Sequence, residues 1–386
     1  MTQFQHYQPT KLTFGAGEIQ KIGQLIAQYG KRCLVVSEPI FDAVKPAYDR
    51  IFTLLAEQGI EVAHFDGVVP NPPTTVVELG RQVAVANDCD VVLAIGGGSS
   101  IDTAKIISAT INTESLDWAH WFATYNSPFG DINPLPAKVV PLIAVPTTSG
   151  TGSQVTQAAV ITDLEQHAKL TLFHPEFFPC EALIDPELML TLPPRMTAMT
   201  GFDAFSHAFE SFTGTRPSPF VDGMALEAMK LVIDNLPNVV DNGADLHGRC
   251  QLAKADTLGG ISLANGGAGA PHPLGEILGS SNTNLPHGLT LAVVYPAYVQ
   301  LQWRKQPERF AQVAELFGAV GSIEEKAQSL AASLVKFLER IGLESNLTQV
   351  GVTKEDVQKL EPAFCFDLPL TSGEEMKKVL QASLVE

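Results

Sequence analysis

The stretch VVLAIGGGSSIDTAKIISAT, residues 91–110, decides the fold expected for the first half of the chain. Its first five residues form an apolar run of strand length, and residues 102–110 carry a helical pattern. The glycines between them therefore follow the carboxyl end of a strand and precede the amino end of a helix. A glycine loop in this position lets backbone amides approach a phosphate group, and the helix dipole favours the anion.

The same loop narrows the kind of ligand. It lacks the GxGxxG spacing, and no Gly-Lys-Ser/Thr follows as in a Walker A loop, so it predicts a diphosphate-bearing cofactor rather than a hydrolysed triphosphate. A tight turn that needs positive φ is the alternative, but three consecutive glycines exceed what one turn requires. We therefore interpret Gly96, Gly97 and Gly98 as part of a phosphate-binding loop.

Strand-like and helix-like segments alternate on the amino-terminal side of this loop. The extended patterns and the helical patterns between them cover, in chain order, residues 12–14, 15–29, 33–37, 47–59, 60–65, 75–87 and 90–95. Strands that alternate with helices of ten or more residues predict a parallel, doubly wound sheet.

A second loop, PTTSGTGSQVT at residues 146–156, follows an apolar strand at 139–145. Its hydroxyl groups suit ribose, phosphate or amide contacts and come from Thr147, Thr148, Ser149, Thr151 and Thr156. Hydroxyl-rich loops also commonly cap helices, so this loop alone is a weak signal. Residues 117–137, which hold several aromatic residues and prolines, are either an excursion over the cofactor cleft or a surface loop.

The strand signals mostly disappear beyond residues 192–194. Helical patterns follow at residues 196–212, 221–236, 244–264, 287–302, 308–317 and 323–341, with two short ones near the end. The change of composition near Arg195 predicts a dinucleotide-binding α/β domain at 1–194. It predicts an all-helical domain at 195–386, which we expect to bind the metal and the substrate.

The candidate metal-binding helix is MTAMTGFDAFSHAFESF, residues 196–212. Asp203 and His207 are four residues apart, so one helical turn stacks them on one face. An ordinary pair on a wet face is the alternative. The neighbouring positions are apolar, however: Met199, Phe202, Phe205, Ala208 and Phe212. A buried carboxylate must be paired or ligated, and a carboxylate with imidazoles suits a divalent cation. We expect His272 and His287 downstream to supply the remaining ligands.

Composition excludes several classes of function. With 386 residues, 45% hydrophobic and 17% charged, the chain is long enough for two cores, which predicts a soluble two-domain protein. Lys and Arg number 25 against 42 Asp and Glu, a net charge of −17, which argues against nucleic-acid or anionic-membrane binding.

Cysteine usage and the opening residues bear on the compartment. The five cysteines are scattered and form no CxxC pair, as is typical of reduced cytosolic thiols: Cys33, Cys89, Cys180, Cys250 and Cys365. The opening MTQFQHYQPTK has no apolar signal region, and no later run of about 18 apolar residues could span a bilayer. We therefore expect a cytoplasmic protein with no membrane anchor.

Taken together, the motifs resemble those of the iron-containing (group III) alcohol dehydrogenases. The matching segments, which extend over nearly the whole chain, are LTFGAG at 12–17, GGGSSIDTAK at 96–105, PTTSGTGSQVT at 146–156, LIDPELM at 183–189, DAFSH at 203–207 and LPHGLTLAVVYP at 285–296. The resemblance implies an α/β N-terminal domain with a parallel Rossmann-like sheet plus an all-α C-terminal domain. Dehydroquinate synthase is similar in fold.

The resemblance also implies a metal site made of one Asp and three His. Asp203, His207 and His287 match that pattern, and His272 needs a choice of register. Relatives often have two histidines four residues apart before the final one. In one register, His272 of the segment PHPLG corresponds to the second of these two, which would put Ala268 at the ligand position. Counting seven residues from Asn265 instead makes His272 the first histidine, and we adopt that register.

This choice leaves Glu276 where many relatives have their second histidine, which is thought to relay protons or contact the nicotinamide. Glu276 could relay protons itself, or it could be a surface residue. The segment between His272 and His287 also looks about one residue longer than in common members. Substrate choice and the proton path are the properties that this departure affects.

For the cofactor, the resemblance implies contacts from Glu38, Asn71, Gly97, Gly98, Ser99, Thr147, Ser149, Thr156 and Lys169. Asp102 and Thr148, from the same two loops, complete the set that we expect. Glu38 follows the strand at 33–37, where a carboxylate can accept hydrogen bonds from an adenosine ribose. A carboxylate there would repel a 2′-phosphate, so NAD is expected in preference to NADP. A solvent-exposed loop glutamate is the alternative.

The predicted reaction is reversible hydride transfer between a small alcohol or aldehyde and nicotinamide. An ion held by Asp203, His207, His272 and His287 would polarise the substrate oxygen as a Lewis acid. The resemblance implies Fe²⁺, although Zn²⁺, Co²⁺ or Ni²⁺ would fit the same donors. Because relatives are often dimers or larger, a homo-oligomer is expected, with small molecules as partners and neither nucleic acid nor membrane.

Three rival functions stay open. A hydroxyacid-oxoacid transhydrogenase is a close variant of the predicted reaction. A lyase of the dehydroquinate-synthase kind would use NAD and metal transiently, but it should carry several Lys and Arg residues around the metal helix to grip a phosphorylated substrate, and few are present there. A non-catalytic nucleotide-binding protein would tolerate loss of the metal ligands, whereas all four residues are present here.

Overall fold

The computed structural model describes residues 3–165, 168–281 and 285–385. The chain forms two compact units, Tyr7–Thr191 and Leu192–Glu386, and Met1–His6 belongs with the second. The sequence placed the domain boundary between residues 194 and 195, close to this change of unit. Residues 282–284, in the segment predicted to be one residue longer than in relatives, lie outside the described part of the chain.

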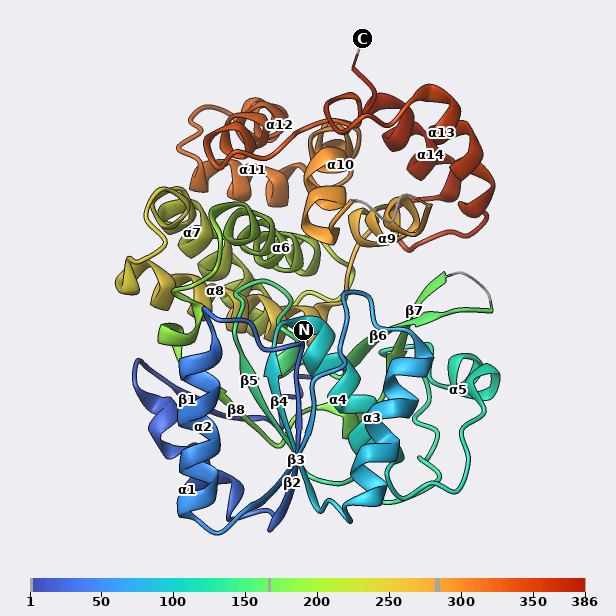
Figure 1. Ribbon diagram of the computed structural model, residues 1–386. Helices are drawn as coiled ribbons and strands as arrows, with labels where there is room; N and C mark the ends of the chain where they lie inside the picture. Colours follow the sequence, from blue (N-terminus) through green and yellow to red (C-terminus); the bar gives the residue numbers. More distant parts are fainter. Residues whose placement is uncertain (1–2, 166–167, 282–284, 386) are drawn as a thin grey trace. The chain divides into compact units, whose positions relative to one another are not determined.

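The first unit contains the expected parallel sheet. Its strands are β1 (Lys11–Phe14), β2 (Arg32–Val36), β3 (Glu61–Phe65), β4 (Val91–Gly96), β5 (Leu142–Pro146) and β8 (Glu181–Ile184). They lie in the order β1-β8-β5-β4-β2-β3, and every neighbouring pair is parallel (Figure 1). The prediction of a parallel Rossmann-like sheet is therefore confirmed.

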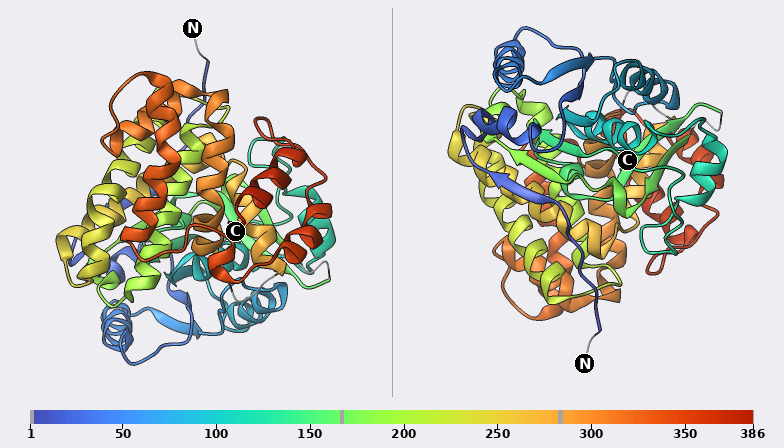
Figure 2. Two further views of the ribbon diagram at one scale, coloured as in Figure 1. Left: turned by 90° about the horizontal axis from the view of Figure 1, so that it is seen from above. Right: turned by 90° about the horizontal axis from the view of Figure 1, so that it is seen from below.

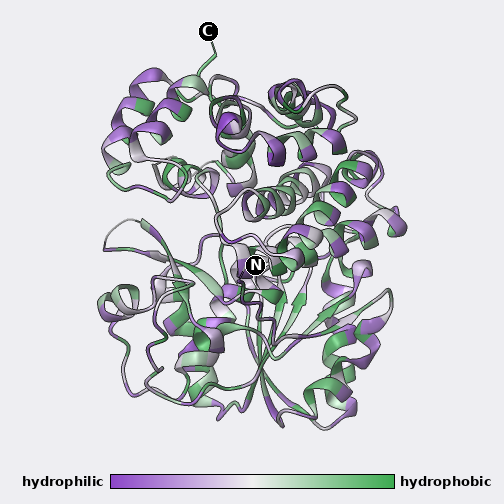
Figure 3. Ribbon diagram, turned by 180° about the vertical axis from the view of Figure 1, so that it is seen from behind, coloured by the Kyte–Doolittle hydropathy of each residue, from purple (hydrophilic) through white to green (hydrophobic). Residues whose placement is uncertain are grey.

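Helices cover both faces of this sheet. Leu34 and Val36 contribute to the core shared with α3 (Thr74–Ala86) and α4 (Gly98–Thr110). Cys33 and Val35 contribute to the opposite core. That core is shared with η1 (Glu18–Lys21), α1 (Ile22–Ile26) and α2 (Lys45–Glu57). Because successive side chains of a strand point to opposite faces, a sheet buried on both sides needs continuous apolar strands. The central strands β4 and β5 meet this condition, since every one of their residues is buried, and Figure 3 shows the middle of the sheet largely in the apolar colour.

Helix α4 begins earlier than the sequence predicted. The expected start was Asp102, but the first helical residue is Gly98, with Gly97 as its N-cap. The glycines were expected to form a loop. Glycine disfavours helix interiors, but this cost is small in a first turn. The free amides of that first turn are thereby set directly at the end of β4.

Two further elements of this unit were not predicted. Residues 117–137 were expected to be irregular, but they contain α5 (Trp118–Thr124), where the Asp117 side chain accepts a hydrogen bond from the His120 N–H at 3.0 Å. Trp121 and Phe122 of α5 are buried in the core next to α4. The other element is β6 (Ala158–Asp163), which pairs antiparallel with β7 (Ala168–Phe173) as a separate hairpin.

Three short 3-10 helices complete the first unit: η2 (Ser153–Val155), η3 (Pro175–Phe177) and η4 (Pro186–Met189).

The second unit is helical in its described residues, as expected. Its helices are α6 (Pro194–Phe212), α7 (Pro219–Asp241), α8 (Leu246–Gly266), α9 (Pro271–Ser281), α10 (His287–Gln302), α11 (Pro307–Leu316), α12 (Ile323–Arg340), α13 (Lys354–Leu360) and α14 (Gly373–Ala382), with the short η5 (Trp303–Lys305), η6 (Thr348–Val350) and η7 (Glu361–Ala363). Helices α6, α7 and α8 pack against one another. Figure 2 shows the red C-terminal helices at the opposite end of this unit from α7.

Helix α9 was not predicted, because its sequence is rich in glycine and proline. Pro271 and Pro273 both lie in its first turn. The N–H groups of a first turn have no partner within the helix, so proline loses nothing there. The helix then continues through Gly275, and it carries both His272 and Glu276.

The core of this unit surrounds α6. Every residue of this helix from Gly201 to Phe212 is buried, which confirms that the candidate metal helix is not a wet surface helix. Phe202, Phe205 and Phe209 pack against Tyr295 of α10 with ring centroids 5.3, 6.4 and 5.5 Å away. In the described residues no helix has both the length and the apolar character needed to cross a membrane.

Candidate metal and nucleotide sites

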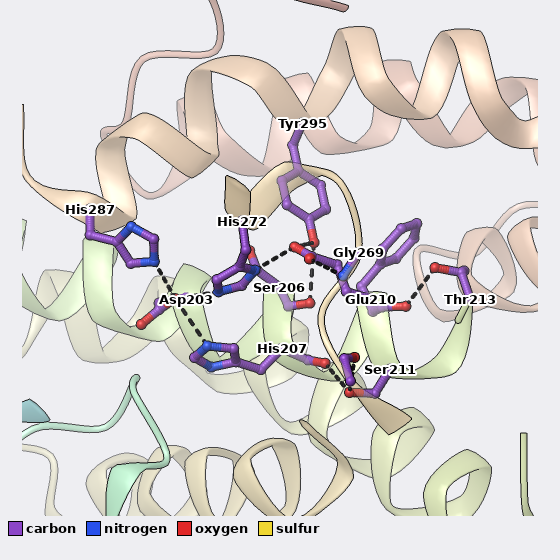
Figure 4. Close-up of polar contacts among 12 residues, drawn as sticks. Asp203, Ser206, His207, Glu210, Ser211, Thr213, Gly269, His272, His287 and Tyr295 are labelled. Atoms are coloured by element: carbon purple, nitrogen blue, oxygen red, sulfur yellow. Dashed lines mark hydrogen bonds and ion pairs between the residues drawn. The ribbon is translucent and has the colours of Figure 1, made fainter. Parts of the chain in front are cut away.

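Four predicted ligands converge in the helical unit. Helix α6 carries Asp203 and His207 one turn apart, α9 carries His272, and α10 begins at His287. The Asp203 Oδ1 atom lies 3.7 Å from the Nε2 atom of each of the three histidines. Donors that each bond a cation at roughly 2.1 Å stand roughly 3.4 Å apart in a tetrahedral site. Figure 4 shows the imidazoles and the carboxylate turned toward one another.

The burial of these side chains also indicates a cation site. Asp203 is 4% exposed and His272 is 7% exposed. In the described part of the chain, Asp203 Oδ1 and His272 Nε2 have no hydrogen-bond partner. A buried polar atom without a partner costs free energy, and native proteins rarely leave one unexplained. Both atoms point at the centre of the cluster, so a cation bound there would satisfy them.

The local charges favour a cation as well. Burial acts to lower the pKa of His272, yet the carboxylates of Glu210 and Asp203 raise that pKa well above its usual value. Burial acts to raise the pKa of Asp203, yet the imidazole of His207 and its neighbours bring it below its usual value. The cluster therefore attracts positive charge, which a divalent ion supplies when it displaces the protons of its ligands.

Glu210, which was not predicted as a site residue, lies one turn beyond His207 on α6 and is buried. Its Oε1 atom accepts hydrogen bonds from His272 Nδ1 at 2.8 Å and from the Tyr295 hydroxyl at 2.9 Å. Its Oε2 atom accepts the Gly269 N–H at 2.7 Å. The available signal was an acid three residues after His207, among the phenylalanines of a helix already taken to be buried.

Glu276, for which a proton relay and a surface residue were the two expectations, lies on α9 one turn beyond His272 and is half-buried. Its carbonyl oxygen accepts a hydrogen bond from the Ser280 hydroxyl at 2.7 Å. Residues four apart share a helix face, so Glu276 lies on the face of α9 that carries the ligand.

The candidate nucleotide site lies at the carboxyl edge of the sheet in the first unit. The chain leaves β2 toward α2 on one face, and it leaves β4 toward α4 on the other. Neighbouring parallel strands whose connections diverge in this way open a crevice where ligands bind. The residue expected to contact ribose, Glu38, is exposed just beyond β2. The glycine loop lies just beyond β4.

The three glycines of the loop have different roles. Gly96 has φ 149°, where a side chain is strained, and a Cβ atom there would meet Ser100 Oγ at 2.4 Å. A Cβ atom on Gly98 would meet Thr151 Cγ2 at 2.7 Å. On Gly97, by contrast, the nearest protein atoms would be 3.4 Å away, at Thr148. Protein packing therefore explains Gly96 and Gly98, but it leaves Gly97 unexplained.

The second loop adjoins the first. Gly96 and Pro146 are partners in the sheet, and the Thr147 N–H donates to the Gly96 carbonyl at 3.0 Å. Thr147, Thr148 and Ser99 are half-buried at this edge. The other three predicted hydroxyls of this loop contact protein groups. Ser149 donates to Met189 Sδ at 3.1 Å, Thr151 accepts from the Ser153 N–H at 3.3 Å, and Thr156 accepts from Lys105 Nζ at 3.2 Å.

Asp102 is buried and engaged with the protein. Its carboxylate accepts the Ser153 hydroxyl at 2.5 Å and the Val160 N–H at 2.9 Å. Lys105, which the sequence analysis did not single out, lies 3.6 Å from Asp102 and donates to the Ser153 hydroxyl at 2.8 Å and the Ala158 carbonyl at 2.6 Å. This buried pair ties α4 to the second loop and to β6.

Asn71 and Lys169 lie at the hairpin. Asn71 is exposed with φ 52°, and its carbonyl accepts the Thr162 hydroxyl at 2.9 Å. Thr162 on β6 is the direct partner of Lys169 on β7. The structure therefore brings these two predicted contacts together across one strand, although they are far apart in sequence.

Two family models match the chain. Residues 9–186 match the one described as "Iron-containing alcohol dehydrogenase". Residues 197–365 match "Fe-containing alcohol dehydrogenase family, C-terminal". The two matches divide between the α/β unit and the helical unit.

Individual relatives agree with these models. The chain is 35% identical over 372 residues to "Choline dehydrogenase" of Bacillus subtilis, covering 95% of this chain and 89% of that protein. It is 32% identical over 365 residues to "NAD-dependent methanol dehydrogenase" of Bacillus methanolicus, covering 93% and 92%. It is 34% identical over 360 residues to "1,3-propanediol dehydrogenase" of Klebsiella pneumoniae, covering 92% and 90%.

Solved structures show the same fold. An archaeal halo-thermophilic alcohol dehydrogenase from a Red Sea brine pool superposes with a TM-score of 0.89 at 28% identity, covering 100% of both chains. A 1,3-propanediol oxidoreductase superposes with a TM-score of 0.90 at 29% identity, covering 99% of this chain and 100% of that one.

Proposed function

The chain belongs to the iron-containing alcohol dehydrogenase family, and we propose that it is a metal-dependent, NAD-linked dehydrogenase of small alcohols. The observation that carries this proposal is the meeting of Asp203, His207, His272 and His287, in which two buried ligand atoms, Asp203 Oδ1 and His272 Nε2, have no hydrogen-bond partner in the described chain. The reaction is reversible hydride transfer between an alcohol carbon and the nicotinamide ring.

Asp203 and the three histidines would hold the metal. A bound divalent cation supplies Lewis acidity, which favours loss of the alcohol proton. Fe²⁺ is the ion proposed here, and Zn²⁺ suits the same nitrogen and oxygen donors. The protein contributes one carboxylate charge among the ligands and a buried setting, in which electrostatic interactions are stronger than in water.

We assign Glu276 the proton transfer that accompanies hydride transfer. Its support is its place on α9, one turn beyond His272 and half-buried. A carboxylate can accept a proton from the alcohol side and release it to water. Replacing Glu276 by Gln is expected to lower turnover while the bound-metal content is unchanged. Loss of metal from this variant would contradict the assignment.

The dinucleotide would bind at the glycine loop. The amides of Gly97, Gly98 and Ser99 at the start of α4 suit its pyrophosphate. Thr147, Thr148, Asn71 and Lys169 are proposed as further contacts near the same sheet edge. For Ser149, Thr156 and Asp102, whose side chains contact protein groups, we propose that they shape the two loops.

NAD is the proposed dinucleotide because Glu38 lies just beyond β2 at the carboxyl edge of the sheet and is exposed. A carboxylate there accepts hydrogen bonds from a ribose and repels a 2′-phosphate. Replacing Glu38 by Gly is expected to shift the ratio of kcat/KM for NAD and NADP toward NADP by roughly 10-fold, equivalent to about 1.4 kcal/mol. An unchanged ratio would contradict the role of Glu38.

The central experiment compares two histidines. Metal-free protein is reconstituted with Fe²⁺ without oxygen, or with Zn²⁺, and bound metal and NADH formation are measured for His272→Ala and for His247→Ala. His272 lies in the cluster, whereas His247 is exposed on α8. His272→Ala should lose bound metal and activity together, and His247→Ala should retain both. Unchanged metal content in His272→Ala would refute the proposed ligand set.

The substrate panel follows from the named relatives. Methanol, 1,3-propanediol, choline and longer primary alcohols are offered with NAD, and the matching aldehydes with NADH. Glu276 places a carboxylate near the cluster. We therefore expect it to increase kcat/KM more for a cationic alcohol such as choline than for a neutral alcohol of similar size. The ratio of kcat/KM for choline and a neutral alcohol in wild type and Glu276→Gln measures this effect.

We also propose a cytoplasmic homo-oligomer. The cysteines of the described chain are all free, which supports a reducing compartment. Light scattering of the purified protein measures the assembly, and a monomer at micromolar concentration would contradict it.

A further inference from the structure

The carboxylate of Glu210 is buried in the helical unit and is fully engaged in hydrogen bonds. Its two oxygen atoms accept hydrogen bonds from three donors, which are His272 Nδ1, the Tyr295 hydroxyl and the Gly269 N–H, at 2.8, 2.9 and 2.7 Å. These donors come from α9, from α10 and from the segment between α8 and α9. One side chain of α6 thus contacts both other helices that carry ligands, α9 and α10, and the segment that precedes α9 (Figure 4).

The hydrogen bond to His272 decides which of its nitrogens can bind a cation. A neutral imidazole carries one N–H, and the nitrogen without it holds the lone pair. Because Nδ1–H donates to Glu210, the lone pair is at Nε2, and this is the atom that lies 3.7 Å from Asp203 Oδ1 with no other partner in the described chain. The opposite tautomer would point a proton at the cluster.

Resting on the proposed metal site, we propose that Glu210 is a positioning residue that fixes the Nε2-donating tautomer of His272 and thereby sets the metal affinity. Hydrogen-bonded partners of metal-binding histidines orient the ring and increase its basicity. Tyr295 and Gly269 in turn hold the Glu210 carboxylate in place through their hydrogen bonds. The Tyr295 hydroxyl is itself positioned near α6, 3.2 Å from the Ser206 carbonyl.

The chemistry of the site requires a carboxylate rather than an amide. All three neighbours are donors, and an amide offers only one acceptor oxygen. In Glu210→Gln, an NH₂ group turned toward Gly269 would oppose another N–H. An NH₂ group turned toward His272 would require an unprotonated Nδ1, which moves the proton to Nε2 and removes the lone pair from the cluster. Either orientation weakens the site without a large change in side-chain volume.

The test measures Zn²⁺ binding to metal-free protein by competition with a chelator. Glu210→Gln is expected to raise the dissociation constant by ~10–100-fold. Tyr295→Phe, which removes one donor and leaves the carboxylate, should raise it less. Glu181→Gln is the matched control, because Glu181 is also buried and accepts a tyrosine hydroxyl, from Tyr29 at 2.7 Å, but in the α/β unit. It should bind Zn²⁺ as the wild type does.

A spectroscopic readout separates tautomer control from a general structural role. In Zn²⁺-loaded wild type, labelled with ¹⁵N-histidine, His272 should show an Nδ1–H signal that exchanges slowly with water, assigned by its loss in His272→Gln. Glu210→Gln should lose that signal while its circular dichroism is unchanged. This measurement on the wild type stands even where Glu210→Gln fails to fold.

The outcomes are distinguishable. A wild-type affinity in folded Glu210→Gln would overturn the role of Glu210 and leave the metal site intact. An Nδ1–H of His272 that exchanges freely in the loaded wild type would overturn it as well. A wild-type chain that binds no Zn²⁺ would overturn the metal site itself, and this inference with it.

Discussion

At the scale of single residues, the two glycines at the start of α4 separate protein packing from ligand binding. A Cβ atom on Gly98 collides with Thr151, whereas a Cβ atom on Gly97 finds ordinary contact distances. Gly97 also has φ −80°, which any residue adopts. Folding alone therefore permits alanine at position 97, and the proposed phosphate contact gives a separate reason for glycine there.

We accordingly expect Gly97→Ala to leave the melting temperature of the free protein near the wild-type value and to weaken NAD binding by roughly 10-fold, about 1.4 kcal/mol. Gly98→Ala should lower the melting temperature, and Thr151→Ser should restore part of the loss because it removes the nearest atom. Calorimetry without and with NAD measures both effects. Unchanged NAD affinity in Gly97→Ala would show that the loop does not cradle the phosphates.

The buried pair in α4 gives a pH dependence with a definite sign. Burial lowers the pKa of Lys105 from 10.5 to about 8, and the nearby Asp102 carboxylate only partly opposes this. Between these two pH values the unfolded chain keeps a proton that the folded chain has lost, so stability rises with pH. This contribution is complete above pH 10.5 and is lost as the pH falls through 8.

The measurement compares the wild type with Asp102→Asn/Lys105→Met, which removes both titrating groups. The difference in free energy of unfolding between the two proteins should shift in favour of the wild type from pH 8 to pH 10, by an amount on the order of 1 kcal/mol. Urea titrations at several pH values provide the free energies. A difference that is constant with pH would mean that Lys105 is protonated throughout this range.

At the scale of elements, the position of α10 against α6 sets the position of His287. Gly288, the next residue, approaches the α6 backbone so closely that a Cβ atom would lie 2.3 Å from the Met199 carbonyl oxygen. A backbone atom cannot rotate away as a side chain can. Close helix contact at this glycine is therefore a condition for the fourth ligand to reach the cluster.

Gly288→Ala should push α10 away from α6, lower the free energy of unfolding by about 1–3 kcal/mol, and weaken metal binding. Gly223→Ala is the matched control, since Gly223 lies on α7 with no atom within 4 Å of an added Cβ. There alanine should stabilise the helix by up to about 1 kcal/mol. Urea unfolding and Zn²⁺ titration of both variants test the contrast, and equal effects of the two substitutions would refute it.

At the scale of the whole molecule, the two candidate sites lie in different compact units, each with its own core. The metal ligands all belong to the helical unit, and the predicted dinucleotide contacts all belong to the α/β unit. A ligand that binds only the folded state stabilises it by mass action, about 2.7 kcal/mol at a concentration 100 times its dissociation constant.

Hydrogen exchange should therefore separate the two ligands. Removal of metal with a chelator should increase exchange in α6, α9 and the start of α10 and lower the melting temperature. Addition of NAD should slow exchange at the glycine loop and the start of α4. Mass spectrometry of peptides measures both patterns. Protection of α4 by metal alone, with no change in α6, would contradict the assignment of the two sites.

The sequence by itself determined the features that repeat along the chain. Alternation of apolar strands and helices indicated the parallel sheet, and a spacing of four residues put Asp203 and His207 on one face of α6. These are local properties, because backbone geometry fixes which neighbours in sequence share a face. His272 and His287 were expected downstream as the remaining ligands, and the resemblance to the family supplied the register for His272.

Only the tertiary structure decided which side chains from other segments contact those helix faces. Glu210 and His272 are 62 positions apart, and their hydrogen bond exists because α6 and α9 pack together. The same holds for Asp102 on α4, which accepts hydrogen bonds from Ser153 of η2 and Val160 of β6. Helix α9 was not predicted because of its prolines, although they lie in its first turn. Side chains far apart in sequence meet through packing, and packing depends on the whole set of buried contacts rather than on any local pattern.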